Sequence, residues 1–156
     1  MKKGGFLLLL LAALCAFAPL RAQTTVLGDR IPDVRPENWF NNVRPASAPL
    51  TVIAFFSASN PACLQALDHL QSLLDDAGTR MRVILVTRDR EEIVDRAVEL
   101  YFSPRMTVAL DTDGSLFRSF GIEYVPFCIL IDARRYVLWQ GNTLHLTAEQ
   151  LAVTTE

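Results

Sequence analysis

The sequence predicts an α/β fold in which one mixed β-sheet lies between two layers of helices. Three observations predict it. The apolar run at residues 50–56 is typical of a central strand buried on both faces, and a strong helix signal follows it. Long helical connections separate the next strand-like runs, which favours parallel pairing because such a crossover needs a dozen or more residues. The runs 127–131 and 136–140 flank a tight turn, so they must pair antiparallel.

The N-terminus has the pattern of a signal peptide. Lys2 and Lys3 precede an almost purely apolar stretch at residues 6–18, and Ala22 is a suitable cleavage position. A membrane helix needs about 20 residues, so this stretch favours a signal peptide over an uncleaved anchor. We therefore expect a periplasmic or otherwise secreted protein with no stable membrane span after cleavage. We expect Cys15 to be lost with the signal peptide.

Three segments describe the predicted domain organisation: a signal peptide (1–22), an extended lead-in (23–49) and one folded domain (50–156). Cleavage after residue 22 leaves 134 residues, which is enough for one domain with a proper core. This mature part carries 12 arginines and 17 acidic residues, a net charge of −5, with no basic stripe. Nucleic-acid binding is therefore not expected. No Cys/His/Asp grouping has metal-ligand spacing, and we expect no metal or other cofactor.

The clearest predicted helix follows the first strand. Asn60 is a strong N-cap residue, Pro61 suits the first helical position, and Gly78 supplies a C-terminal stop. Apolar residues at three- and four-residue spacing predict its core face: Leu64, Leu67, Leu70, Leu74 and Ala77.

The other predicted strands are short β-branched and apolar runs: residues 82–87, 108–110, 127–131 and 136–140. Asp89 and Glu92 have capping-box spacing for a helix that continues to the Ser-Pro pair at 103–104. A short helix is predicted at 113–120. Thr147 is placed to cap a final helix that runs out at the C-terminus.

Four segments in order match one family: the Gly-x-x-x-Pro-Asp lead-in at 28–33, then 55–63, 111–121 and the Gly-x-x-x-Val-Pro block followed by a strand at 121–132. With these features the chain resembles the exported, redoxin-like thiol–disulfide oxidoreductases of the TlpA/ResA type, across essentially the whole mature part. The resemblance implies a thioredoxin-like three-layer α/β/α sandwich with a mixed central sheet. It also implies a cis peptide bond before Pro126 and an ancestry in reducing or isomerising disulfides of exported proteins.

Segment 55–63, Phe-Phe-Ser-Ala-Ser-Asn-Pro-Ala-Cys, aligns with the family's Phe-Trp-Ala-x-Trp-Cys-x-x-Cys. Asn60 stands at the position of the nucleophilic cysteine, and its amide cannot attack a disulfide. Ser59 replaces the preceding tryptophan, and Ala54 stands where thioredoxin proper has a buried acid. Dithiol exchange needs one thiolate to form a mixed disulfide and a second to resolve it. With only the resolving position, Cys63, still a cysteine, we expect ordinary exchange to be weak or lost.

Cys128, two residues after Pro126, is the candidate partner of Cys63. Side chains alternate along a strand, so only one of Phe127 and Cys128 faces the helix that carries Cys63. If Cys128 faces it, a disulfide is feasible, either structural or redox-active. Two buried core cysteines are the alternative. By the resemblance, Val125 and Pro126 shape the groove that takes substrate peptide.

Two kinds of function remain open. The first is residual thiol–disulfide chemistry at Cys63, with exported proteins as substrates and a membrane protein as electron donor. The second is a non-catalytic module that binds exported proteins or peptides by backbone hydrogen bonds beside Pro126. A one-cysteine peroxidase is disfavoured, because Asn60 stands where a Thr-x-x-Cys motif would need threonine. We expect His69 to be solvated or packed rather than a catalytic base.

Overall fold

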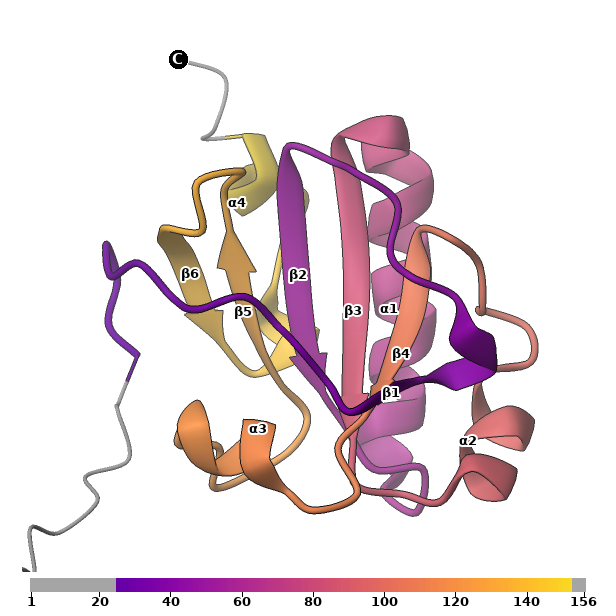
Figure 1. Cartoon of the computed structure of the whole chain (residues 1–156). Helices are drawn as coiled ribbons and strands as arrows, with labels where there is room; N and C mark the ends of the chain where they lie inside the picture. Colours follow the sequence, from indigo (N-terminus) through magenta and orange to yellow (C-terminus); the bar gives the residue numbers. More distant parts are fainter. Residues whose placement is uncertain (1–24, 153–156) are drawn as a thin grey trace, which may run out of the picture.

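The computed structural model describes residues 25–152, which form a mixed sheet with helices on both faces (Figure 1). The strands are β1 (Asn38–Trp39), β2 (Leu50–Phe55), β3 (Met81–Thr87), β4 (Met106–Leu110), β5 (Phe127–Ile131) and β6 (Val137–Gly141). The helices are α1 (Pro61–Ala77), α2 (Glu91–Val98), α3 (Ser115–Ser119) and α4 (Ala148–Ala152). Three short 3-10 turns join them: η1 (Phe40–Asn42), η2 (Gly78–Arg80) and η3 (Thr143–His145).

The strand order across the sheet is β1-β4-β3-β2-β5-β6. β2 pairs with β3, and β3 with β4, in parallel, as the helical crossovers between them require. β5 runs antiparallel to both β2 and β6, and β1 runs antiparallel to β4. The predicted α/β/α sandwich with a mixed sheet is therefore confirmed.

Each face of the sheet carries its own apolar core. On one face α1, α2 and α4 pack against side chains of the central strands. On the other, α3 is the helix that contributes, through Leu116 and Phe117. Figure 1 is drawn from this second side, with α1 behind the sheet and the lead-in crossing in front. Three helices of the described chain therefore cover one face of the sheet, whereas α3 and the extended lead-in cover the other.

Helix α1 begins and ends as predicted, with Asn60 as its N-cap and Gly78 at its C-terminal end. Its buried stripe differs from the prediction at one position. Leu64 is 41% exposed, whereas Cys63 is fully buried. One residue advances an α-helix by about 100°, so Leu64 lies on the flank of the face that Cys63 turns to the sheet. The inclusion of Leu64 in the core face was wrong.

Helix α2 does not have the predicted capping box. Arg90 is its N-cap residue and makes no side-chain capping bond, and the helix ends at Val98 rather than continuing to residues 103–104. The Asp89 carboxylate bonds instead to a loop that precedes α1. The Asp89 carboxylate, which the local pattern predicts to cap α2, thus binds the distant Ala58 N–H instead.

Helix α3 is oriented by a buried aspartate. Asp111, at the end of β4, is 3% exposed, and its carboxylate accepts hydrogen bonds from the backbone N–H groups of Leu116 and Phe117, both at 3.0 Å. The helix has Gly114 at its N-cap, with no side-chain cap of its own. Asp111 therefore satisfies the free N–H groups of the first turn from outside the helix.

The lead-in joins the sheet. Its described part supplies β1, and Ile31 and Phe40 are buried in the cores of opposite faces. At the other end of the chain, the Thr147 N–H donates to Gln150, in keeping with the predicted cap of α4. The proposed signal peptide (1–22) and the end of the predicted last helix (153–156) lie outside the described residues.

Two kinds of feature are absent from residues 25–152. No helix there combines the length and apolar character needed to cross a membrane. In the same range, no three His, Cys, Asp or Glu side chains are grouped so as to hold a metal ion.

Candidate functional site

The candidate site lies where β2 ends, between the first turn of α1 and the segment before β5. Asn60 joins the two. Its Oδ1 accepts a hydrogen bond from the Ala62 N–H at 2.9 Å, which caps the helix. Its Nδ2 donates to the Val125 carbonyl oxygen at 3.2 Å. Both polar atoms of the Asn60 side chain are thus engaged, one in the helix and one across the site.

The peptide bond between Val125 and Pro126 is cis, as the resemblance implied. Pro126 is buried and Val125 is half-buried. The structure therefore places Asn60 beside the two residues predicted to shape the groove. No hydrogen bond from the Val125 N–H is found within residues 25–152, whereas its carbonyl oxygen accepts from Asn60.

Cys63 sits in the first turn of α1 and is fully buried. Burial raises the pKa of its thiol, the nearby negative charge of Asp89 adds to that rise, and the Ser57 N–H, which donates to Sγ at 3.4 Å, lowers it. The net direction is upward, so the thiol is protonated at neutral pH. Burial is thus the main influence on this thiol, and it outweighs the hydrogen bond from the Ser57 N–H.

Asp89 fixes the loop that carries this thiol's neighbours. Its carboxylate accepts hydrogen bonds from the Ala58 N–H at 2.6 Å, the Thr87 hydroxyl at 2.9 Å and the Ser57 hydroxyl at 3.4 Å. The Ser57 hydroxyl also lies 3.0 Å from that of Ser59. Sequence reasoning missed Asp89 as a site residue, because its partners Ser57 and Ala58 are about thirty residues away and nothing local indicates them.

Cys128 lies on β5 opposite Ala54 of β2 and is fully buried in the core that also contains Cys63. Cys128 rather than Phe127 therefore faces the side of α1. The two cysteines are free thiols, which corresponds to the alternative of two buried core cysteines. Burial raises the pKa of Cys128 to about 12, slightly opposed by the adjacent Thr143 hydroxyl. That hydroxyl is itself buried, and within the described part of the chain it has no hydrogen bond of ordinary geometry.

His69 is packed and not poised for proton transfer at the site. It is half-buried on α1, and its Nε2 lies 2.6 Å from the carbonyl oxygen of Leu146. A carbonyl oxygen only accepts, so Nε2 carries the proton in this contact. His69 therefore ties α1 to the segment before α4.

The surface on the α3 side of the Val125–Pro126 segment is partly apolar. Tyr124 is 57% exposed, and its ring meets that of Phe127 edge to face at 5.3 Å between centroids. A hollow of about 300 Å³ lies against these two rings and is also lined by Phe120 and Ile122. Leu64, on the flank of α1, is a second exposed apolar side chain near the start of that helix. Such a surface can take an apolar side chain of a bound chain.

No family model and no curated relative matches this chain. Solved structures do match it. The thioredoxin domain of a thiol-disulfide oxidoreductase from Bacteroides vulgatus is similar with a TM-score of 0.63 and 18% identity, over 82% of this chain and 99% of that one. A thioredoxin-like protein from Aeropyrum pernix gives 0.58 and 20%, over 72% and 77% of the two chains. StoA from Bacillus subtilis gives 0.54 and 21%, over 72% and 86%.

These likenesses define the class of fold. This chain combines that fold with two local features: a buried cysteine in the first turn of α1 and a cis proline before β5. The chain is thus a thioredoxin-like protein by fold, and the fold expected from the resemblance is confirmed. Sequence identities near 20% carry the fold alone, and activity has to be argued from the site.

Proposed function

We propose that this chain is an exported thioredoxin-fold protein in which ordinary dithiol exchange is weak or lost. One observation carries the proposal. At the position where exchange needs an attacking thiolate, Asn60 has both side-chain polar atoms bound, to the Ala62 N–H and to the Val125 carbonyl. An amide held in this way is a structural group and offers no nucleophile.

The remaining thiols support the same proposal. Cys63 is buried, is protonated at neutral pH, and has no second cysteine in a Cys-x-x-Cys to release a mixed disulfide. Cys128 is buried as deeply, and its pKa is raised to about 12. Thiolate character and access both govern exchange, and the two cysteines lack both.

Reduction of insulin by dithiothreitol tests this proposal. We expect the wild-type chain to accelerate the reaction no more than its Cys63→Ala variant, with thioredoxin as the active reference. Rapid turnover that disappears in Cys63→Ala would contradict the loss of exchange. Export is tested separately by N-terminal sequencing of the protein from the periplasm or medium, where we expect the chain to begin at Gln23. An intact N-terminus in the cytoplasm would contradict it.

A binding function is the second candidate, favoured by the surface beside Pro126. The Val125 N–H is open within the described chain, and the hollow against Tyr124 can receive a side chain of an extended peptide. Binding of this kind relies on backbone hydrogen bonds and apolar contact, and needs no thiolate. It therefore survives the replacement of the nucleophilic cysteine by Asn60.

Capture of exported proteins from periplasmic extract tests the binding function. We expect partners to be retained equally with and without reductant, and to be lost in Tyr124→Ala. Tyr136→Ala is the matched control, because Tyr136 is an exposed tyrosine next to β6, outside the hollow. Retention that needs an oxidised thiol, or that falls equally in both variants, would contradict a binding surface at Tyr124.

A further inference from the structure

A cavity of about 530 Å³ lies on the face of the sheet opposite α1. Its floor consists of sheet side chains, and its rim comes from three separate parts of the chain: the lead-in at 30–35, the segment 45–48 and the turn 132–135 between β5 and β6. Figure 1 shows the lead-in crossing this face of the sheet. Among the described residues, α3 is the only helix that packs on this face. The cavity therefore exists because a chain segment, and not a helix, covers this part of the sheet.

The charge of this cavity contrasts with that of the whole protein. Five arginines line it: Arg30, Arg35, Arg82, Arg134 and Arg135. Asp33 and Asp132 are its acidic residues, so its formal charge is +3, whereas the whole chain has a net charge of −2. The sequence shows no basic run, and the fold gathers these charges from distant segments.

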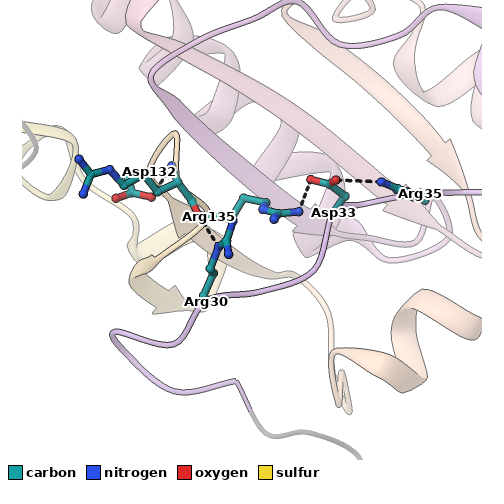
Figure 2. Close-up of polar contacts among 6 residues, drawn as sticks. Arg30, Asp33, Arg35, Asp132 and Arg135 are labelled. Atoms are coloured by element: carbon teal, nitrogen blue, oxygen red, sulfur yellow. Dashed lines mark hydrogen bonds and ion pairs between the residues drawn. The ribbon is translucent and has the colours of Figure 1, made fainter.

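Asp33 is the internal counter-ion of the cavity. Its carboxylate lies 2.6 Å from Nη1 of Arg135 and 3.3 Å from Nη2 of Arg35, and Figure 2 shows the two guanidinium groups meeting it from opposite sides. The Arg135 hydrogen bond, above all, lowers the pKa of Asp33. The other aspartate, Asp132, accepts at Oδ1 from the backbone N–H groups of Arg134 and Tyr136. It forms no ion pair with an arginine of the described chain.

Arg82 is held at the start of β3, and among residues 25–152 it has no ion-pair partner. Its Nε donates to the Thr51 hydroxyl and its Nη1 to the Ala46 carbonyl, both at 2.8 Å. These acceptors are neutral, and burial lowers the pKa of the half-buried guanidinium. Burying a charge without an opposite charge is costly, and a bound anion offsets that cost. Arg82 is therefore a fixed donor whose charge is offset only through space by Asp33, which raises its pKa against the effect of burial.

We propose that this cavity binds a small soluble molecule through its phosphate group. Guanidinium groups match phosphate oxygens in bidentate geometry, and an excess of three positive charges suits a doubly charged anion. The volume lies within the range of small-molecule sites and exceeds the need of a free phosphate ion, which leaves room for the organic part of a phosphate ester. Asp33 competes with the ligand for Arg35 and Arg135.

The test is a titration with inorganic phosphate and with glycerol 3-phosphate, at ionic strength held constant with chloride. The Nε–Hε resonances of Arg82 and Arg135 are followed by NMR. We expect saturable shifts, with the ester binding more tightly than inorganic phosphate. Phosphatidylglycerol vesicles form a separate arm, in which we expect no more sedimentation of the protein than with phosphatidylcholine, because the site is a cavity and not a flat surface.

Four variants decide the proposal. Arg82→Gln and Arg135→Gln each remove one guanidinium and should weaken binding about tenfold, as expected for the loss of a charged hydrogen-bond donor. Arg135→Gln alone is sufficient if Arg82→Gln fails to fold. Asp33→Asn releases two guanidinium groups and should tighten binding severalfold. Arg96→Gln is the control, because it removes an exposed arginine on α2, which packs on the opposite face.

The control variant, the chloride control and the vesicle arm each have an outcome that would overturn the proposal. A surface that attracts anions only through overall charge would respond equally to Arg135→Gln and Arg96→Gln. Shifts that do not saturate, or that chloride reproduces at the same ionic strength, would also refute it. Vesicle binding without binding of the soluble phosphates would assign the arginines to a membrane surface and overturn the proposal.

Discussion

The Asp89 carboxylate accepts a 2.6 Å hydrogen bond from the Ala58 N–H and so ties the end of β3 to the loop that precedes α1. The same carboxylate binds the Thr87 hydroxyl, and its charge opposes ionisation of Cys63. Asp89 thus holds the loop in position and also adds to the burial that raises the pKa of the Cys63 thiol.

Replacing Asp89 should change stability and thiol reactivity together. Asp89→Asn weakens several hydrogen bonds to a charged acceptor, and we expect the free energy of unfolding to fall by about 1–3 kcal/mol. It also removes a like charge, so the pKa of Cys63 should fall and its alkylation at pH 8 should become faster. Urea unfolding and iodoacetamide kinetics measure the two effects. Asp95→Asn, which removes an exposed carboxylate of α2, should change neither.

Cys128 should make the protein less stable in alkali. Its thiol has a pKa of about 12 when folded, against an ordinary 9.0. A raised pKa means that the folded state holds the proton more tightly, so this contribution is fully present below about pH 9 and is lost as the pH rises toward 12. The loss approaches about 1.4 kcal/mol per pH unit. The difference in unfolding free energy between wild type and Cys128→Ala, measured from pH 8 to 11, should shrink accordingly; a constant difference would contradict it.

Restoring a cysteine at position 60 should restore redox chemistry. The Cys63 N–H donates to the Asn60 carbonyl at 2.9 Å, so the two residues face each other across one helical turn. We expect Asn60→Cys to form a disulfide with Cys63 on mild oxidation, seen as a loss of two mass units, and to reduce insulin measurably. Ser59→Cys adds a cysteine one residue earlier and should do neither. An inactive Asn60→Cys that does form the disulfide would show that the surrounding residues also lack what exchange needs.

Asp111 should be essential to the face that carries α3. Asp111→Ala leaves the N–H groups of Leu116 and Phe117 buried without an acceptor, and we expect a loss of about 2–3 kcal/mol in unfolding free energy. Asp113→Ala, two residues later on an exposed position, should cost less than about 1 kcal/mol. Thermal unfolding of the two variants compares them directly. Equal losses would contradict the special role of the buried carboxylate.

Local signals explain which elements could be predicted. The N-cap Asn60, Pro61 and Gly78 bound α1 within its own sequence, and the structure agrees at both ends. The two-residue strand β1 lies in a Pro-rich segment and forms because β4 offers an open edge, which no local pattern reveals. The local pattern predicts that Asp89 caps a helix, because its competing partner, the Ala58 N–H, is distant in sequence.

The candidate site also has features that the sequence predicts and others that only the fold reveals. The position of Asn60 and the cis peptide bond before Pro126 follow from the motifs, and the structure bears out the second. The bond from Asn60 to Val125 spans 65 residues and depends on how α1 meets β5. Likewise, the arginine-lined cavity unites residues from the lead-in, β3 and the turn before β6. Sequence shows such charges as scattered, because only the fold makes them neighbours.

The Asn60–Val125 hydrogen bond has a consequence for the environments in which this fold can work. A pair of cysteines at this corner changes its bonding whenever the surroundings become more oxidising or more reducing. An amide does not respond to electron transfer, so the contact between α1 and the strand after Pro126 is the same in both conditions. The shape of this corner is thereby uncoupled from the redox poise of the compartment.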